Sequence, residues 1–307
     1  HASYAYFSFG HPLQLLPVGL FGTSIAKAAL PTLSHDADDI EKFKITLFSS
    51  LNQLIFFALP VSVFLVVLRV PIIRLVYGTE IFSWRATVQT GYVLSAFAVG
   101  VVFQAANSLL ARAFYAQNDT KTPVSVSIVS IILIIILDFI FINLFKLEVW
   151  GLALAFTVGC IIQSVMLLYL LNKKYLHADL NKILNPFVKS FAASAISGLL
   201  MFFILKVFDR SVWIKRLSFL TQLEATKNLP FERFVLDTRY TVNLLILTLI
   251  VGVIGMVVYI LVSVILKSEE LGVFISLLKR MFIERQITPI PQKETETISP
   301  TPTETTN

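Results

Sequence analysis

Seven separate runs of apolar residues, each long enough to cross a bilayer, dominate this sequence. A hydrocarbon core roughly 30 Å thick is spanned by about 20 residues of α-helix. A helix satisfies every backbone hydrogen bond within its own segment, which an open strand or a loop in lipid cannot do. Hydrophobic residues make up 56% of the chain and charged residues 14%, too little charge to cover a water-soluble domain of this size. The sequence therefore predicts an all-α membrane protein with about seven transmembrane helices.

The apolar runs define an order of elements along the chain. The first run is too long for one straight span and contains Pro12, Pro17, Gly19 and Gly22, so we expect a bent helix whose main part covers 13–33. Five helices are expected in a bundle within residues 1–175, and a final helix pair within 176–286. The predicted helices are 2–33, 43–68, 88–111, 124–145, 150–171, 187–208 and 242–266. The polar segment 209–240 separates the last two on the outer side. Residues 287–307, rich in Thr, Pro and Glu, are expected to be disordered.

The positive charge of the chain is explained by membrane topology. The net charge is +6 and the pI about 9.3, yet Lys and Arg are scattered between apolar runs and form no basic face, so we expect no nucleic-acid partner. Cytoplasmic loops of membrane proteins are enriched in Lys and Arg. The loop with Lys173, Lys174 and Lys182 and the segment after the seventh span are both basic. They lie on one side if there are seven spans, which predicts a cytoplasmic C-terminus.

Three charged residues lie at or near membrane depth. An ionised group there costs on the order of 3 kcal/mol or more, so each needs a physical reason. Asp138, within the fourth span, is either a cation- or proton-coupling carboxylate or a protonated, hydrogen-bonded group near the outer interface. Lys27 either lines a cavity and meets an anionic headgroup or extends to the inner interface. Arg112 is at the inner end of the third span, a common position for Arg.

No enzyme signature is present in the sequence. The four His are scattered, no metal-ligand spacing occurs, and the single Cys160 lies within an apolar run. The neutral polar residues Gln104 and Asn107 are expected to form helix–helix hydrogen bonds. Helices broken by Pro and Gly that carry occasional charge favour a transporter without catalytic residues, metal or cofactor.

Two segments resemble the MurJ (MviN) family of lipid II flippases. The first is Leu16-Pro17-Val18-Gly19-Leu20-Phe21-Gly22 with Leu30-Pro31-Thr32-Leu33-Ser34; the second is Arg112-Ala113-Phe114-Tyr115-Ala116 with Asp119-Thr120-Lys121-Thr122-Pro123. Gly151-Leu152-Ala153 at the start of the fifth span fits the same family. The resemblance extends from about residue 3 to residue 266.

The resemblance implies a fold and an activity. Such proteins have fourteen helices in two lobes with a final pair, and this chain matches helices eight to fourteen. They carry lipid II, the undecaprenyl-pyrophosphate-linked disaccharide-peptide, across the bacterial cytoplasmic membrane by alternating access for cell-wall synthesis. The expected partners are lipid II and membrane lipids. The chain opens at His1 without Met, so we expect a fragment that lacks the first lobe.

The resemblance also bears on individual residues. Family members often carry an Arg in the first of these helices that faces the central cavity, whereas this chain has Pro12 there, preceded by His11. The candidates for binding the headgroup in the cavity are therefore Lys27, His11 and Arg112. Asp138 falls where some members have an acidic residue linked to sodium, so coupling to Na⁺ or H⁺ is a further expectation.

Two alternative functions remain open at this point. One is a related polysaccharide flippase or a cation-coupled multidrug antiporter. Such proteins usually have twelve helices, so the extra pair after the fifth span argues against them. The other is a membrane scaffold that transports nothing, to which the Pro12 departure gives some support.

Overall fold

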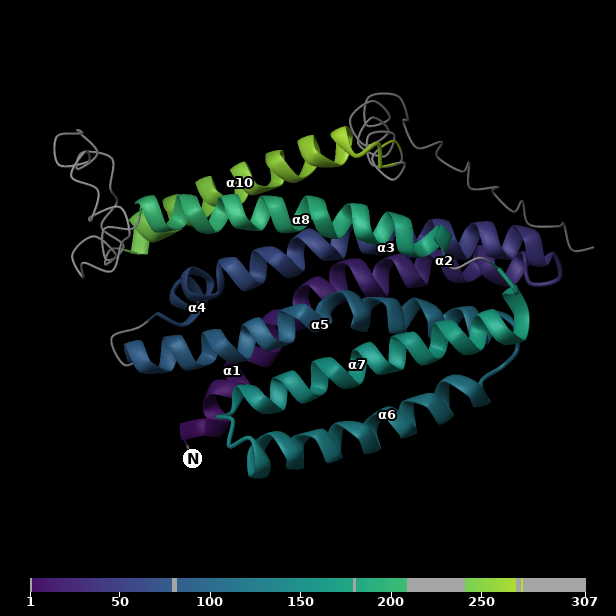
Figure 1. The fold of residues 1–307 in the computed structure, drawn as a ribbon, viewed down its shortest axis with the longest axis horizontal. Coiled ribbons are helices and arrows are strands. Elements are labelled where there is room, and N and C mark those ends of the chain that lie inside the picture. The colour runs from purple at the N-terminus through teal and green to yellow at the C-terminus, as the bar shows by residue number, and fades with distance from the viewer. Residues whose placement is uncertain (1, 79–81, 179–180, 209–240, 269–271, 273–307) are drawn as a thin grey trace, which may run out of the picture. The chain divides into compact units, whose positions relative to one another are not determined.

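The computed structural model describes residues 2–78, 82–178, 181–208, 241–268 and 272 (Figure 1). Seven of its helical segments are long and apolar enough to cross a membrane, which confirms the all-α membrane fold. The expectations for 209–240 and for the tail 287–307 concern residues outside those described. The described residues between 2 and 268 belong to one compact unit.

The first span is bent by a change of helix type. α1 (Ala2–Pro17) continues into the π-helix η1 (Val18–Thr23) and then into α2 (Ser24–His35). Pro12 and Pro17 have no N–H to donate to the preceding turn, which loosens the α-helical ladder before the π-helical segment begins. The predicted bent helix over 2–33 is confirmed, with two further residues at its end.

The second span is followed by a short, separate helix. α3 (Ile40–Val67) begins at Asp39, whose side chain accepts a hydrogen bond from the Lys42 N–H. α4 (Arg69–Tyr77) follows after Leu68.

The third span is the centre of the unit. α5 (Trp84–Ala116) is longer than predicted at both ends and begins after Ser83, which accepts a hydrogen bond from the Ala86 N–H. In its most apolar stretch, 67% of the residues are buried inside the protein, against 11% for the fourth span. It packs against α1, α2, α3, α4 and α7. The outer helices therefore face lipid, while α5 supplies most of the core.

The fourth and fifth spans form a hairpin on one side of α5. α6 (Lys121–Phe139) ends in the π-helix η2 (Ile140–Leu144), and α7 (Trp150–Leu171) ends in η3 (Asn172–Leu176). α6 packs almost entirely against α7, and Figure 1 shows α7 between α6 and α5.

The last two spans pack on the other side. α8 (Asn181–Phe208) begins earlier than the predicted residue 187 and contains Pro186 within its second turn. α10 (Thr241–Ile265) matches its prediction closely. α8 contacts both α3 and α10, and α10 lies along α8 in Figure 1. The division into a bundle at 1–175 and a final pair at 176–286 stays a prediction.

The connections after α2, α5 and α7 meet at one end of the unit. The Gln117 side chain donates to the Ala37 carbonyl at 3.2 Å, and Lys174 forms an ion pair with Asp119 at 2.9 Å. The helices therefore alternate in direction as membrane spans require.

Candidate functional site

The π-helical segment η1 lies directly against α5. A Cβ added to Gly22 would lie 2.7 Å from the Ala105 Cα and 2.8 Å from its Cβ. Backbone carbonyls of this segment accept side-chain hydrogen bonds. The Gly19 carbonyl accepts from the Thr23 hydroxyl at 2.7 Å, and the Thr23 carbonyl accepts from Arg112 at 3.2 Å. A π-helical turn offset from the α-helical ladder is often found at functional sites.

Arg112 is therefore occupied in holding this segment. It is half-buried in α5, one turn before the helix ends at Ala116. Its guanidinium NH1 donates to the carbonyl of Thr23, the last residue of η1, which joins the third span to the bend of the first. The position alone had suggested an ordinary interfacial Arg, and this contact could not be read from the sequence.

Lys27 lies one turn beyond Thr23 on α2 and is exposed. It makes no hydrogen bond or ion pair with any residue that the structure describes. The helix continues to His35, so Lys27 lies about 12 Å before its end. Its ammonium group is thus available to an anion.

His11 is at a different level of the membrane from Lys27. Its ring stacks on Phe7 at a centroid distance of 6.1 Å and meets the edge of Phe97 at 5.4 Å. It precedes Lys27 by about 24 Å along the same span. The structure brings Arg112 and Lys27 to one region and leaves His11 apart from them.

A buried amide pair near His11 was missed by sequence reasoning. Gln14 is fully buried, and the Gln104 amide donates to its Oε1 at 2.7 Å. The Nε2 of Gln14 has no partner among the described residues. Gln104 was expected to bond between helices, which is confirmed. The one signal in the sequence that could have pointed to Gln14 is its position one helical turn after His11.

A second amide network joins three spans. The Asn107 side chain donates to the Cys160 carbonyl at 3.1 Å and to the Gln163 Oε1 at 3.3 Å. Gln163 in turn donates to the Ser127 hydroxyl at 3.0 Å. Asn107 was expected to form such helix–helix bonds, and the network ties α5, α6 and α7 together.

Asp138 stands alone near the far end of α6. It is half-buried, and its Oδ1 has no partner among the described residues. Ile134, one turn earlier, fills the space beside Gly159 of α7. Asp138 lies about 25 Å along α6 from Lys121, whereas Arg112 is near the level where α6 begins. The described residues include no group of three potential metal ligands.

The junction of α5 and α6 contains a hydrogen-bonded carboxylate. Asp119 accepts bonds from the Thr122 N–H at 3.0 Å, from the Thr122 hydroxyl at 2.6 Å and from Lys174 at 2.9 Å. Partial burial works to raise the pKa of Asp119. The bonds from Thr122 and Lys174 outweigh it and hold the pKa well below its ordinary value.

Acid is therefore expected to weaken this junction. A carboxyl whose pKa is lowered by folding contributes stability above its unfolded pKa of about 3.9, and this contribution is lost as pH falls further. We expect the melting temperature of the purified protein to fall by roughly 4 °C more between pH 5 and pH 3 than that of Asp119→Asn. Identical pH profiles for the two proteins in a thermal-shift measurement would contradict this account.

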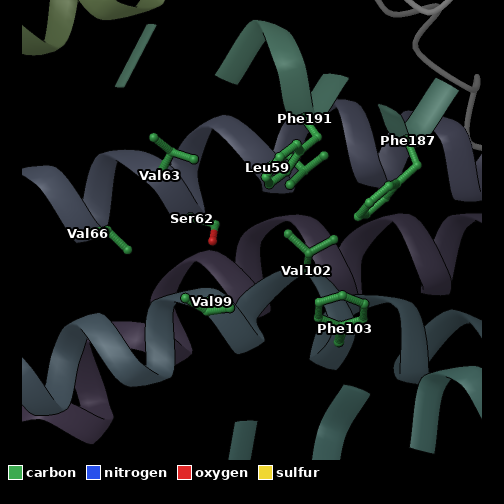
Figure 2. Close-up of a pocket in the computed structure, with 9 residues that line it drawn as sticks. All are labelled: Leu59, Ser62, Val63, Val66, Val99, Val102, Phe103, Phe187 and Phe191. Carbon is green, nitrogen blue, oxygen red and sulfur yellow. The ribbon is translucent and has the colours of Figure 1, made fainter. Parts of the chain in front are cut away.

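An apolar pocket lies between α3, α5 and α8, as Figure 2 shows. Its volume is about 220 Å³. The polar side chain in its lining is Ser62, whose hydroxyl already donates to the Ala98 carbonyl at 2.5 Å. The lining residues are Leu59, Ser62, Val63, Val66, Val99, Val102, Phe103, Phe187 and Phe191. Such a pocket suits hydrocarbon and offers no free polar group.

Known proteins share both the sequence and the fold. A sequence model of the family described as "Lipid II flippase MurJ" matches residues 1–223. The "Lipid II flippase MurJ" of Thermosipho africanus is 33% identical over 178 residues, which are 57% of this chain and 36% of that protein. The "Probable lipid II flippase MurJ" of Thermotoga maritima is 33% identical over 159 residues, which are 50% of this chain and 32% of that protein.

A solved structure extends the match to nearly all of the chain. The structure titled "Lipid II flippase MurJ, inward closed conformation" superposes with a TM-score of 0.60 at 26% identity, covering 92% of this chain and 48% of that one. The match thus spans about a third of the length of the two relatives and about half of the solved protein. Because the family's sequence pattern covers residues 1–223 and the fold agrees, the chain belongs to the MurJ family of lipid II flippases.

Proposed function

We propose that this chain is the second lobe and final helix pair of a transporter that moves lipid II across the bacterial cytoplasmic membrane. The match of residues 1–223 to the family carries the proposal. The solved relative is about twice as long, which agrees with a lobe that works against a partner lobe. The polar headgroup would pass through a cavity between lobes that opens alternately to each side, and no covalent bond would change.

Lys27 is the residue of this chain that we assign to the headgroup. The substrate carries a pyrophosphate, and an exposed ammonium without a partner among the described residues can bind it through charge-assisted hydrogen bonds. Arg112 contributes indirectly, because its guanidinium fixes the bend that positions α2. His11 and the Gln14–Gln104 pair would meet the headgroup only at the opposite level of the cavity.

The apolar pocket is our candidate for contact with the lipid tail. The polyprenyl chain stays in hydrocarbon while the headgroup moves, so it needs an apolar surface beside the cavity. The pocket has such a surface on three spanning helices. Of the final helix pair, α8 contributes to this pocket, together with α3 and α5.

Asp138 is our candidate for ion coupling. An ionised, half-buried carboxylate at membrane depth raises the free energy of the folded protein unless it binds a proton or a cation. It is distant from Lys27, so any coupling to Na⁺ or H⁺ would act through the conformational equilibrium rather than by contact with the headgroup.

The orientation follows from the loops that meet at one end. The helix ends beside these connections carry Lys42, Lys44, Lys121, Lys173 and Lys174. By the positive-inside rule we place this end in the cytoplasm, and with it the C-terminal side of α10.

The test is replacement of an essential flippase. This chain is co-expressed with the first lobe of a lipid II flippase of the same family in a bacterium whose own lipid II flippase is depleted, with an empty vector and each half alone as controls. We expect growth to continue and lipid II to become accessible at the outer face of the membrane. If the protein accumulates in the membrane while lipid II stays inside, the proposed function is wrong. Resistance to cationic drugs without lipid II export would instead support the antiporter alternative.

A further inference from the structure

A proline interrupts the hydrogen-bond ladder of α3 within the membrane. Pro60 is buried inside this helix. A residue at this position would normally donate its N–H to the carbonyl four residues earlier, which here belongs to Phe56. Proline has no N–H, and its ring displaces that carbonyl from the helix axis. In lipid, a backbone carbonyl needs a donor from elsewhere in the protein.

That donor comes from the last span. The Tyr259 hydroxyl of α10 donates to the Phe56 carbonyl at 2.7 Å. Tyr259 is 2% exposed, one of the largest fully buried side chains, and its ring meets the Phe56 ring at a centroid distance of 5.2 Å. The bond is therefore fully desolvated, which strengthens it and raises the cost of losing it.

The helices around this bond approach each other closely. A Cβ added to Gly255, one turn before Tyr259, would collide with the Met201 side chain of α8 and lie 3.2 Å from the Phe64 ring of α3. The Ser197 hydroxyl of α8 donates to the Gly255 carbonyl at 2.6 Å. Small residues at such contacts let membrane helices pack tightly. α3, α8 and α10 thus meet at one tightly packed point beside the Tyr259–Phe56 bond.

We infer that Tyr259 is a positioning residue whose hydroxyl takes the place of the Pro60 N–H and fixes the final helix pair to α3. This attachment has a consequence that rests on the proposed function: α8 and α10 move with the second lobe as one body during transport. The pair is then a wall of that lobe rather than a separate mobile element.

A double-mutant cycle tests the replacement of the missing N–H. Tyr259→Phe removes the hydroxyl that donates to the Phe56 carbonyl, so we expect the melting temperature to fall by roughly 3 °C. Pro60→Ala restores a backbone donor to the same carbonyl. In that background Tyr259→Phe should have less than half of its effect. An equal loss in both backgrounds would mean that the hydroxyl acts only through packing, and the inference would be wrong.

The chain offers a matched control for the cycle. The Tyr77 hydroxyl also donates to a carbonyl of another helix, that of Phe9 at 3.1 Å. The residue four positions after Phe9 is Leu13, which has its own N–H. Tyr77→Phe should therefore give the same small change whether residue 60 is Pro or Ala. Pro60→Ser serves as a second donor-restoring variant if Pro60→Ala does not accumulate.

Movement of the pair is measured separately. Spin labels at Ile45 of α3 and Leu261 of α10, both exposed, are placed in a Cys160→Ala background. We expect their distance distribution to be the same with and without lipid II, and to broaden in Tyr259→Phe. A lipid II-dependent change in the protein with Tyr259 would overturn the rigid attachment. The stability cycle needs no transport, so its success beside a failed flippase assay would reject only the proposed function.

Discussion

Gly22→Ala is expected to destabilise the protein severely, and Gly22→Leu to prevent its accumulation as a folded protein. The added Cβ would lie 2.7 Å from the Ala105 Cα, which is backbone of the central helix and cannot rotate away. Forced overpacking of this kind costs about 3 kcal/mol, which corresponds to a fall in melting temperature of roughly 6–12 °C for a domain of this size. The fall in melting temperature is measured by heating the detergent-solubilised protein and monitoring the loss of its monodisperse peak in size-exclusion chromatography.

Gly19 supplies the control within the same π-helical segment. A Cβ at Gly19 would meet nothing within 4 Å. Gly19→Ala removes backbone freedom from the unfolded chain, so it should leave the melting temperature unchanged or slightly raised. Equal destabilisation by Gly19→Ala and Gly22→Ala would show that the segment needs glycine for backbone conformation and not for its approach to α5.

Replacing Lys27 by Gln is expected to reduce lipid II transport by roughly tenfold or more without changing stability. A charge-assisted hydrogen bond contributes about 1.5–3 kcal/mol, and a tenfold change corresponds to about 1.4 kcal/mol. Lys27 has no bonded partner among the described residues, so its removal should leave the fold intact. The rate at which lipid II becomes accessible at the outer face, normalised to the amount of protein, gives the effect.

Lys44→Gln is the matched control for charge. Lys44 carries the same charge at the same end of the unit but is paired with Glu41 at 2.6 Å. We expect transport by this variant to remain near normal, and Lys27→Arg to retain a substantial part of the activity. Transport by Lys27→Gln at the normal rate would support the alternative reading, in which Lys27 only extends its amine to the membrane interface.

Much of the fold could be predicted because the bilayer imposes a local rule. Each run of about 20 apolar residues must form its backbone hydrogen bonds within itself, because lipid offers no partners, and so it must be a helix. The hydropathy of the sequence therefore identified all seven spans. Pro12 and Pro17 predicted the bend of the first span for an equally local reason. The errors are at helix ends. α5 extends to Ala116 and α8 begins at Asn181, because polar residues that leave the hydrocarbon can still continue a helix in water.

The functional residues were less predictable. Lys27 and Asp138 could be selected as charges at membrane depth, yet the sequence could not tell whether either has a partner. Arg112 was selected by motif, but its bond to the Thr23 carbonyl joins residues 89 positions apart. Gln14 is an ordinary polar residue in the sequence and becomes distinctive only through its burial against Gln104.

The sequence by itself determined that this chain crosses a membrane, where it crosses and to which family it is similar, because these depend on the composition and motifs of single segments. Only the tertiary structure decided which faces of the helices meet. Spans that are apolar on nearly every side carry little information about their rotation, so contacts are set by small residues and isolated hydrogen bonds. The bond between Tyr259 and the Phe56 carbonyl joins residues 203 positions apart. Pro60 removes the donor that the helix itself would give the Phe56 carbonyl, and the packing of α10 against α3 brings the Tyr259 hydroxyl to it.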